Sequence, residues 1–305
     1  MSAAPGPRSS PSTNRIGVST TTLKTVALAA LVTIGFGCGP RADANDARMV
    51  RSLDDDLSGV VAVASSVDEQ GKTISLCSGA LVAPNLVLTA RHCVSRAVTN
   101  TPACDTRGHS RNGVHLAEDV DPGAIMIFEG AHVSPGADEP IARAVRTLRP
   151  TGQVLCDADV AFLVLDRAIP NAVVLPMRLY GAVKKGDLVV PIGFGGGVAN
   201  SVGRRVARAS SNVLSIGPVA NVDTGAVLGP REFEVAEATC RGDSGGPAID
   251  AHTGEIVGVV SRGGSCTNAG NHVYTRIDAY SRLATMALVA AGRQPYENLA
   301  ERERE

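Results

Sequence analysis

The sequence is poor in aromatic residues: it contains no Trp, and Phe and Tyr make up only 3% of its 305 residues. The hydrophobic core of a chain of this length must then be built mainly from Val, Leu, Ile and Ala. A surplus of charge is also missing, because the net charge at pH 7 is only −1. Proteins that bind nucleic acid usually carry a basic surplus, so we expect no nucleic-acid partner.

Cysteine pairs typical of zinc sites are absent as well. None of the seven cysteines forms a C-x-x-C motif, and only His92-Cys93 joins a histidine to a cysteine. We therefore expect no metal and no cofactor. If Cys38 is set aside, the remaining cysteines suit disulfides in an oxidising compartment. These are Cys77, Cys93, Cys104, Cys156, Cys240 and Cys266.

No apolar run is long enough to span a bilayer comfortably. The run Val26–Gly37 has the length of the apolar part of a secretory signal, and Arg8, Arg15 and Lys24 supply the positive charges that precede such a part. We therefore predict a signal peptide with its cleavage region over residues 1–44. The protein is then exported, as a secreted, periplasmic or lipid-anchored protein.

Two endings of this signal compete. Cys38 directly follows the apolar run, as in bacterial lipoproteins, and a lipid on Cys38 would attach the protein to a membrane. However, Gly35 stands where such signals usually have Leu. The small residues Ala42–Ala44 instead offer ordinary cleavage after Ala44. An uncleaved anchor is a third interpretation.

Short Val-rich runs separated by Gly, Pro, Asn and Asp follow from about residue 58. Runs of this length between turn residues predict the strands of an antiparallel barrel or sandwich. They cover 59–66, 79–83, 124–131, 160–165, 187–195, 205–217, 255–261 and 272–277. The segment Pro170–Gly181 is a candidate connection between two halves.

The flanks of this region differ in character. Residues 45–56 are polar and are interpreted as a linker, and residues 293–305 form a charged tail. Between them, residues 278–291 have helical spacing of apolar residues. Asp278 is the expected N-cap of this helix and Gly292 its stop signal.

The stretch "CRGDSGGPAID" holds the first candidate for catalysis, Ser244. Gly242 and Gly245 allow the backbone to turn tightly around it. The amides of Gly242 and Ser244 are then candidates for an oxyanion hole. A serine nucleophile also needs a base and a group that orients the base.

His92 is the candidate base. It lies next to Cys93, and a disulfide from Cys93 to Cys77 would pin this turn to the preceding strand, a short loop whose closure is worth about 3 kcal/mol. Taken alone, a histidine beside a cysteine is more often structural. Asp159 directly precedes an apolar run, where a carboxylate is costly to bury unless it accepts hydrogen bonds. Orienting an imidazole is one use for it, although it can also cap a strand.

Asp157 and Asp166 are alternative acids near the same run. A different serine hydrolase pattern, the G-x-S-x-G elbow, also fits around Ser244. In that pattern the acid and the histidine follow the serine. Here the best candidates, His92 and Asp159, precede it, so chain order argues against the elbow.

The motifs "LTARHC", "DVAFLVL" and "GDSGGP", in this order, resemble those of the chymotrypsin/trypsin-like serine proteases. The resemblance covers roughly residues 57–292. It implies an all-β fold of two six-stranded antiparallel barrels with a C-terminal helix, the first barrel over about 57–170 and the second over about 181–277. It also implies a serine endopeptidase that acts on polypeptides.

By this resemblance, His92 is the general base, Asp159 its orienting partner and Ser244 the nucleophile. Gly242 and Ser244 supply the oxyanion amides. Ser261 lines the substrate strand and helps to bind the aspartate. The family pattern also pairs Cys77 with Cys93 and Cys240 with Cys266, which leaves Cys104 and Cys156 as a pair by elimination. The substrate-binding candidates are Ala238, Ser261, Arg262, Gly263 and His272.

The sequence departs from the family at the specificity pocket. Ala238 stands where members that cut after Lys or Arg have Asp, so cleavage of the trypsin type is not expected. His272 replaces a usual Gly, and Arg262 stands where Trp is common. These two residues would either accept an acidic substrate side chain or narrow the pocket, and we expect a small or acidic preference.

A second departure concerns activation. Many members free an "IVGG"-type N-terminus that pairs with the aspartate before the nucleophile, here Asp243. No such segment precedes the first expected strand, and Arg51 marks a processing point only poorly. Either Asp243 has another partner or activation differs. Two alternatives to a protease remain, a protease-like binding protein without turnover and an unrelated exported β domain.

Overall fold

The computed structural model describes residues 57–66, 74–99, 101–196, 203–236, 239–263, 266 and 271–292. The expected signal peptide with Cys38, the linker, the charged tail and Ala238 lie outside the described residues. Among the described helices, none is both long and apolar enough to cross a membrane.

The first barrel closes from six antiparallel strands in the order β1-β2-β3-β8-β7-β6. Strand β6 pairs back to β1 and completes the cylinder, with Val63 opposite Ile127. Its interior is filled by Val, Leu, Ile and Phe side chains, as the scarcity of aromatic residues requires. The strands are β1 Val60–Ser66, β2 Ile74–Ala83, β3 Leu86–Thr89, β6 Ile125–Phe128, β7 Ala142–Leu148 and β8 Ala161–Leu165.

The second barrel follows the order β9-β11-β14-β17-β16-β15 and closes through the β9–β15 pairing. Phe233 and Tyr274 stack in its core with ring centroids 5.2 Å apart. The strands are β9 Leu188–Gly193, β11 Ser211–Ile216, β14 Glu232–Val235, β15 Pro247–Asp250, β16 Ile256–Arg262 and β17 His272–Arg276. The short strand β10 Val206–Ala207 pairs with the last two residues of β9, Ile192 and Gly193.

Two small hairpins and several 3-10 turns complete the described chain. Strands β4 Ser95–Ala97 and β5 Leu116–Asp119 pair with each other, as do β12 Val219–Ala220 and β13 Val227–Leu228. The 3-10 turns are η1 Leu57–Gly59, η2 Arg91–Cys93, η3 Pro122–Ala124 and η4 Asp278–Tyr280. The expected fold of two six-stranded barrels with a C-terminal helix is thus confirmed.

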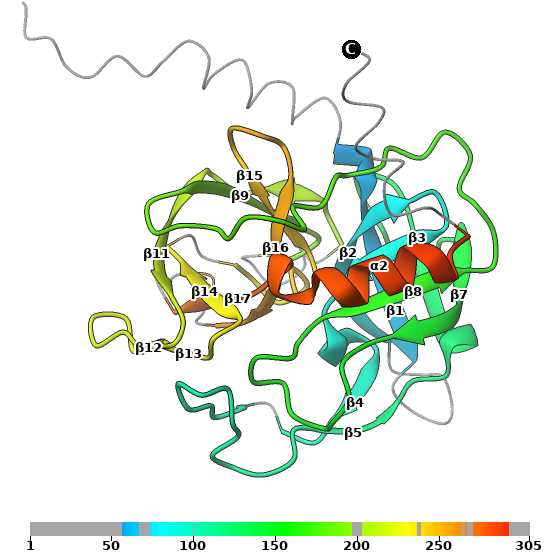
Figure 1. The fold of residues 1–305 in the computed structure, drawn as a ribbon. Coiled ribbons are helices and arrows are strands. Elements are labelled where there is room, and N and C mark those ends of the chain that lie inside the picture. The colour runs from blue at the N-terminus through cyan, green and yellow to red at the C-terminus, as the bar shows by residue number, and fades with distance from the viewer. Residues whose placement is uncertain are drawn as a thin grey trace, which may run out of the picture. The chain divides into compact units, whose positions relative to one another are not determined.

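The C-terminal α-helix begins later than the start at residue 278 that the sequence predicts. Residues 278–280 form η4, and the α-helix α2 covers Ser281–Ala290. Asp278 does not cap it; its carboxylate pairs with Arg276, 2.5 Å away. Helix α2 packs beside β8 (Figure 1), with Ala284, Ala287 and Leu288 buried. Its apolar face thereby covers the outside of the first barrel, which explains why β8 is buried along its whole length.

Among the described residues there are three disulfides, Cys77–Cys93, Cys104–Cys156 and Cys240–Cys266. They join the pairs that the sequence led us to expect. The first ties β2 to η2, and the second ties the segment between β4 and β5 to the residues just before β8. Each disulfide includes a cysteine that lies within a few residues in sequence of His92, Asp159 or Ser244.

Candidate active site

His92 is placed by the turn that follows the first strand pair. Strand β3 ends at Thr89, and η2 holds His92 between Arg91 and Cys93. The Cys77–Cys93 disulfide fixes this turn to β2, and the backbone amide of His92 donates to Asp159 Oδ1 at 3.0 Å. Cys77 and Cys93 lie close to the His92 ring, but both sulfurs are bonded to each other and so cannot act as thiolate ligands.

Asp159 lies two residues before the start of β8 at Ala161 and is fully buried. Its Oδ2 atom accepts from His92 Nδ1 at 2.8 Å and from the Ser261 hydroxyl at 2.6 Å. Burial raises the pKa of Asp159, but the facing His92 and the hydrogen bonds that Asp159 accepts lower it by more. The pKa of Asp159 is therefore below its ordinary value. An ionised Asp159 can only accept, which makes Nδ1 of His92 the protonated nitrogen.

The pKa of His92 is raised. Burial alone lowers it, and the charge and hydrogen bond of Asp159 outweigh that effect. With Nδ1 bound to Asp159, the Nε2 atom of neutral His92 is left as a proton acceptor. The ring lines a pocket of about 810 Å³, which Ser244 also lines. Among the described residues, no hydrogen bond joins the Ser244 hydroxyl to His92, and such bonds are often long without substrate.

The loop around Ser244 is docked onto the first barrel by Ser78 of β2. The Ser78 amide donates to the Ser244 carbonyl at 2.7 Å, and its hydroxyl donates to the Gly242 carbonyl at 2.7 Å. Gly242 and Gly245 have φ values of +104° and +80°, in the region that favours glycine. A Cβ atom at Gly245 would lie 2.2 Å from the Thr89 hydroxyl, so only glycine fits this approach.

The amides of Gly242 and Ser244 have no acceptor within the part of the chain that the structure describes. The amides of Asp243, Gly245 and Gly246 in the same loop, by contrast, donate to carbonyl groups. Two unused donors on either side of Asp243 are what an oxyanion site requires.

The pocket is lined by both barrels. The first barrel contributes His92 and a wall from the segment between β4 and β5, which includes Thr99 and Arg111. The second contributes Ser244 and, at and just after the end of β16, Ser261, Arg262 and Gly263. His272 does not line it, because this side chain is fully buried with Nδ1 3.0 Å from the Thr239 hydroxyl.

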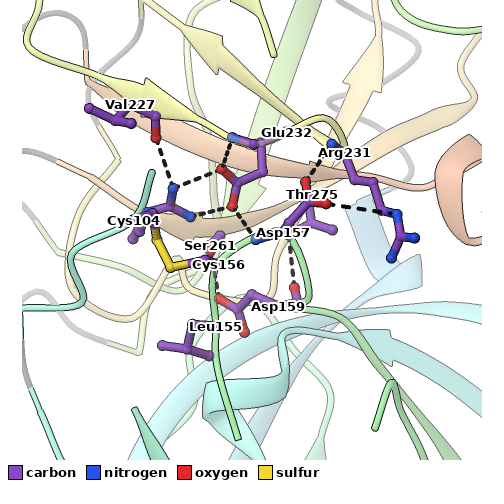
Figure 2. Close-up of polar contacts among 12 residues, drawn as sticks. Cys104, Leu155, Cys156, Asp157, Asp159, Val227, Arg231, Glu232, Ser261 and Thr275 are labelled. Atoms are coloured by element: carbon purple, nitrogen blue, oxygen red, sulfur yellow. Dashed lines mark hydrogen bonds and ion pairs between the residues drawn. A yellow bond between two sulfur atoms is a disulfide. The ribbon is translucent and has the colours of Figure 1, made fainter. Parts of the chain in front are cut away.

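Arg262 is not available to a substrate carboxylate. Its guanidinium binds both oxygens of Glu232, at 2.5 and 2.8 Å, and the carbonyl of Val227. Figure 2 shows that Glu232 lies beside Asp157, where its carboxylate accepts a hydrogen bond from the Asp157 backbone amide. It also shows the Ser261 side chain turned toward Asp159. Of the two expected roles, Arg262 fits shaping the pocket rather than binding an acidic side chain, whereas His272 does not line the pocket and fits neither role.

Sequence reasoning missed two groups at this site. Arg208 pairs with Asp243, and the buried Glu232 holds Arg262. The sequence did leave room for a partner of Asp243 other than a freed N-terminus. However, the chain contains many arginines, and no local sequence pattern identifies Arg208 among them. The sequence analysis also did not foresee that the segment between β4 and β5 lines the pocket.

Comparison with known proteins extends these observations. The model of the family described as Trypsin matches residues 59–284. The "Cercarial protease" of Schistosoma mansoni is 25% identical over 210 residues, which cover 64% of this chain and 73% of that protein. "Trypsin Blo t 3" of Blomia tropicalis is 25% identical over 224 residues, which cover 68% and 76%.

Among solved structures, an inactivated protease paralogue of the scabies mite, SMIPP-S-I1, has a similar fold. The TM-score is 0.56 at 18% identity, and the match covers 76% of this chain and 95% of that one. At this identity the likeness concerns the fold alone.

Proposed function

Because this chain belongs to the trypsin family, we propose that it is a serine endopeptidase in which Ser244, His92 and Asp159 act together. The observation that carries the proposal is the buried Asp159–His92 pair, which faces the pocket that Ser244 lines. The family supplies the class of reaction, and the contacts of these side chains support the assignment of roles. The substrate is a polypeptide.

In the proposed reaction, the Ser244 hydroxyl oxygen attacks the peptide carbonyl carbon while Nε2 of His92 takes its proton. Asp159 keeps the ring in the required tautomer and stabilises the imidazolium. The oxyanion accepts from the amides of Gly242 and Ser244. Collapse of the tetrahedral species breaks the C–N bond, and the amine leaves with the proton from His92. Water repeats the sequence, which releases the acid and restores Ser244.

Covalent labelling with a fluorophosphonate, read by intact mass, tests this proposal. A single adduct is expected on the folded, disulfide-bonded protein, and it should be absent in Ser244→Ala and His92→Ala. Ser134→Ala is the matched control, because Ser134 is exposed and does not line the pocket. If the folded chain forms no adduct even after limited proteolysis near Arg51, the alternative of a protease-like binding protein replaces this proposal.

We also propose that the protein acts outside the cytoplasm. The disulfides support this, since such bonds persist in oxidising compartments. Lipid attachment at Cys38 stays a prediction from the sequence, and a bacterial source would follow only from that attachment. The relatives reported above come from a schistosome and a mite. Expression with the native N-terminus tests the lipid: a diacylglycerol-sized mass increase, absent in Cys38→Ala, is expected for the lipoprotein form.

A further inference from the structure

Asp243, the residue before Ser244, is a buried charge that needs a partner. Its side chain is only 2% exposed. Oδ1 accepts from the amide of Gly195 at 2.7 Å, and Oδ2 accepts from the amide of Cys240 at 2.8 Å. A buried carboxylate with amide donors alone still lacks a compensating positive charge.

Arg208 supplies that charge. Its Nη2 atom lies 2.7 Å from Asp243 Oδ2 and 2.9 Å from the carbonyl of Gly195, and the side chain is largely buried. The Arg208 amide also donates to Pro191 of β9, so the residue is fixed at both ends. In the described part of the chain, Arg208 is the only charged side chain in contact with Asp243.

The Arg208–Asp243 ion pair anchors the candidate oxyanion loop, which is the segment Gly242–Ser244. Asp243 lies between the amides of Gly242 and Ser244, so the position of its carboxylate determines where those amides point. The fit is close, because a Cβ atom at Gly195 would lie 2.5 Å from the Asp243 carboxyl carbon. If the carboxylate lost its cation, it would be driven toward water and would take the loop with it.

We propose that Arg208 is a positioning residue that keeps the oxyanion loop formed in the uncut chain, so that activity requires no newly freed N-terminus. The inference rests on the proposed endopeptidase function and concerns the control of the same site. The cation is a side chain within the body of the protein, and the pair is present without any cleavage. A guanidinium also forms a planar fork that suits a carboxylate, which an amine cannot reproduce.

The test measures the rate of fluorophosphonate labelling of Ser244 between pH 7 and 10.5 on the uncut chain, whose integrity intact mass verifies. The variants are Arg208→Gln and Arg208→Lys, with Arg204→Gln as control, because Arg204 is exposed and nearby in sequence. The wild-type rate should reach a plateau at high pH without falling. Arg208→Gln should label roughly 10²-fold more slowly, the size of effect seen when an oxyanion donor is lost.

Arg208→Lys separates positioning from a purely structural role. Lysine restores the charge at neutral pH and loses it as its pKa is passed, so labelling should be near the wild-type rate at pH 7 and fall at alkaline pH. An Arg208→Gln protein that remains folded and labels at the wild-type rate overturns the inference. So does a wild-type chain that labels only after proteolysis. A wild-type chain that labels under neither condition overturns the proposed function itself.

Discussion

At Asp159, a single carboxylate organises the candidate active site. The His92 ring, the His92 amide and the Ser261 hydroxyl all donate to it. The first donor comes from one barrel and the last from the other, so the residue also helps to join them. The Thr275 hydroxyl adds a fourth contact, to the Asp159 carbonyl at 3.0 Å. The charge of Asp159 raises the pKa of His92 and selects its tautomer.

Asp159→Asn should therefore slow the labelling of Ser244 by roughly 10³- to 10⁴-fold, because the amide would favour the wrong tautomer of His92. In the wild type, labelling needs neutral His92, so the rate should be lost as pH falls through a midpoint above the ordinary value of about 6.5. Asp166→Asn, at the exposed far end of β8, is the control. Equal labelling rates in the two variants would contradict the assignment.

Asp157 makes a separate prediction about stability. Burial raises its pKa to about 6, with the negative charge of Glu232 adding to the effect and the Arg231 amide opposing it. The folded state then holds a proton that the unfolded state has released between about pH 4 and pH 6. This residue's contribution to the free energy of unfolding is therefore most favourable below about pH 4 and decreases as pH rises to 6.

Asp157→Asn should remove that penalty, since Asn is neutral, has a similar shape and tolerates the φ of +62° found here. Urea unfolding should find the variant more stable than the wild type at pH 7, with the difference shrinking toward pH 4. A difference that does not vary with pH would count against a raised pKa.

At the scale of elements, β8 and β16 could be predicted because their apolar residues are adjacent in sequence. Strand β14 could not, although all four of its residues are buried. Its sequence "EFEV" has two glutamates, which locally indicate a solvated face. Glu232 is satisfied by Arg262, and Glu234 by Asn221 and Asn271. These partners lie outside the strand, beyond the reach of a local pattern.

Because Glu232 is buried and pairs with the largely buried Arg262, breaking this ion pair should lower the free energy of unfolding substantially. Glu232→Gln leaves the buried guanidinium without a counter-ion and should destabilise the fold by about 3 kcal/mol or more. The double variant Glu232→Gln, Arg262→Met should recover part of that loss, because no charge is then left unpaired. Denaturant unfolding of both single variants and the double variant gives the coupling, and purely additive effects would refute the pairing.

For the whole molecule, the near-zero net charge hides an asymmetry at the pocket. Three arginines line it, Arg111, Arg241 and Arg262, and no Asp or Glu does so among the described residues. Glu232 neutralises Arg262, whereas Arg111 and Arg241 are exposed and pair with no carboxylate in the described chain. The small or acidic preference expected from the sequence stays a prediction, and its acidic part now rests on Arg111 and Arg241 rather than on Arg262 and His272.

Peptides with Glu near the cleaved bond should therefore be cut faster than the same peptides with Lys. Arg241→Gln should lower kcat/KM for the Glu peptides about two- to fivefold, as expected for an exposed ion pair. The effect should shrink at 1 M salt, where the screening length is about 3 Å. Arg146→Gln, an exposed arginine away from the pocket, is the control. Faster cleavage of the Lys peptides would show that the field of these arginines does not select the substrate.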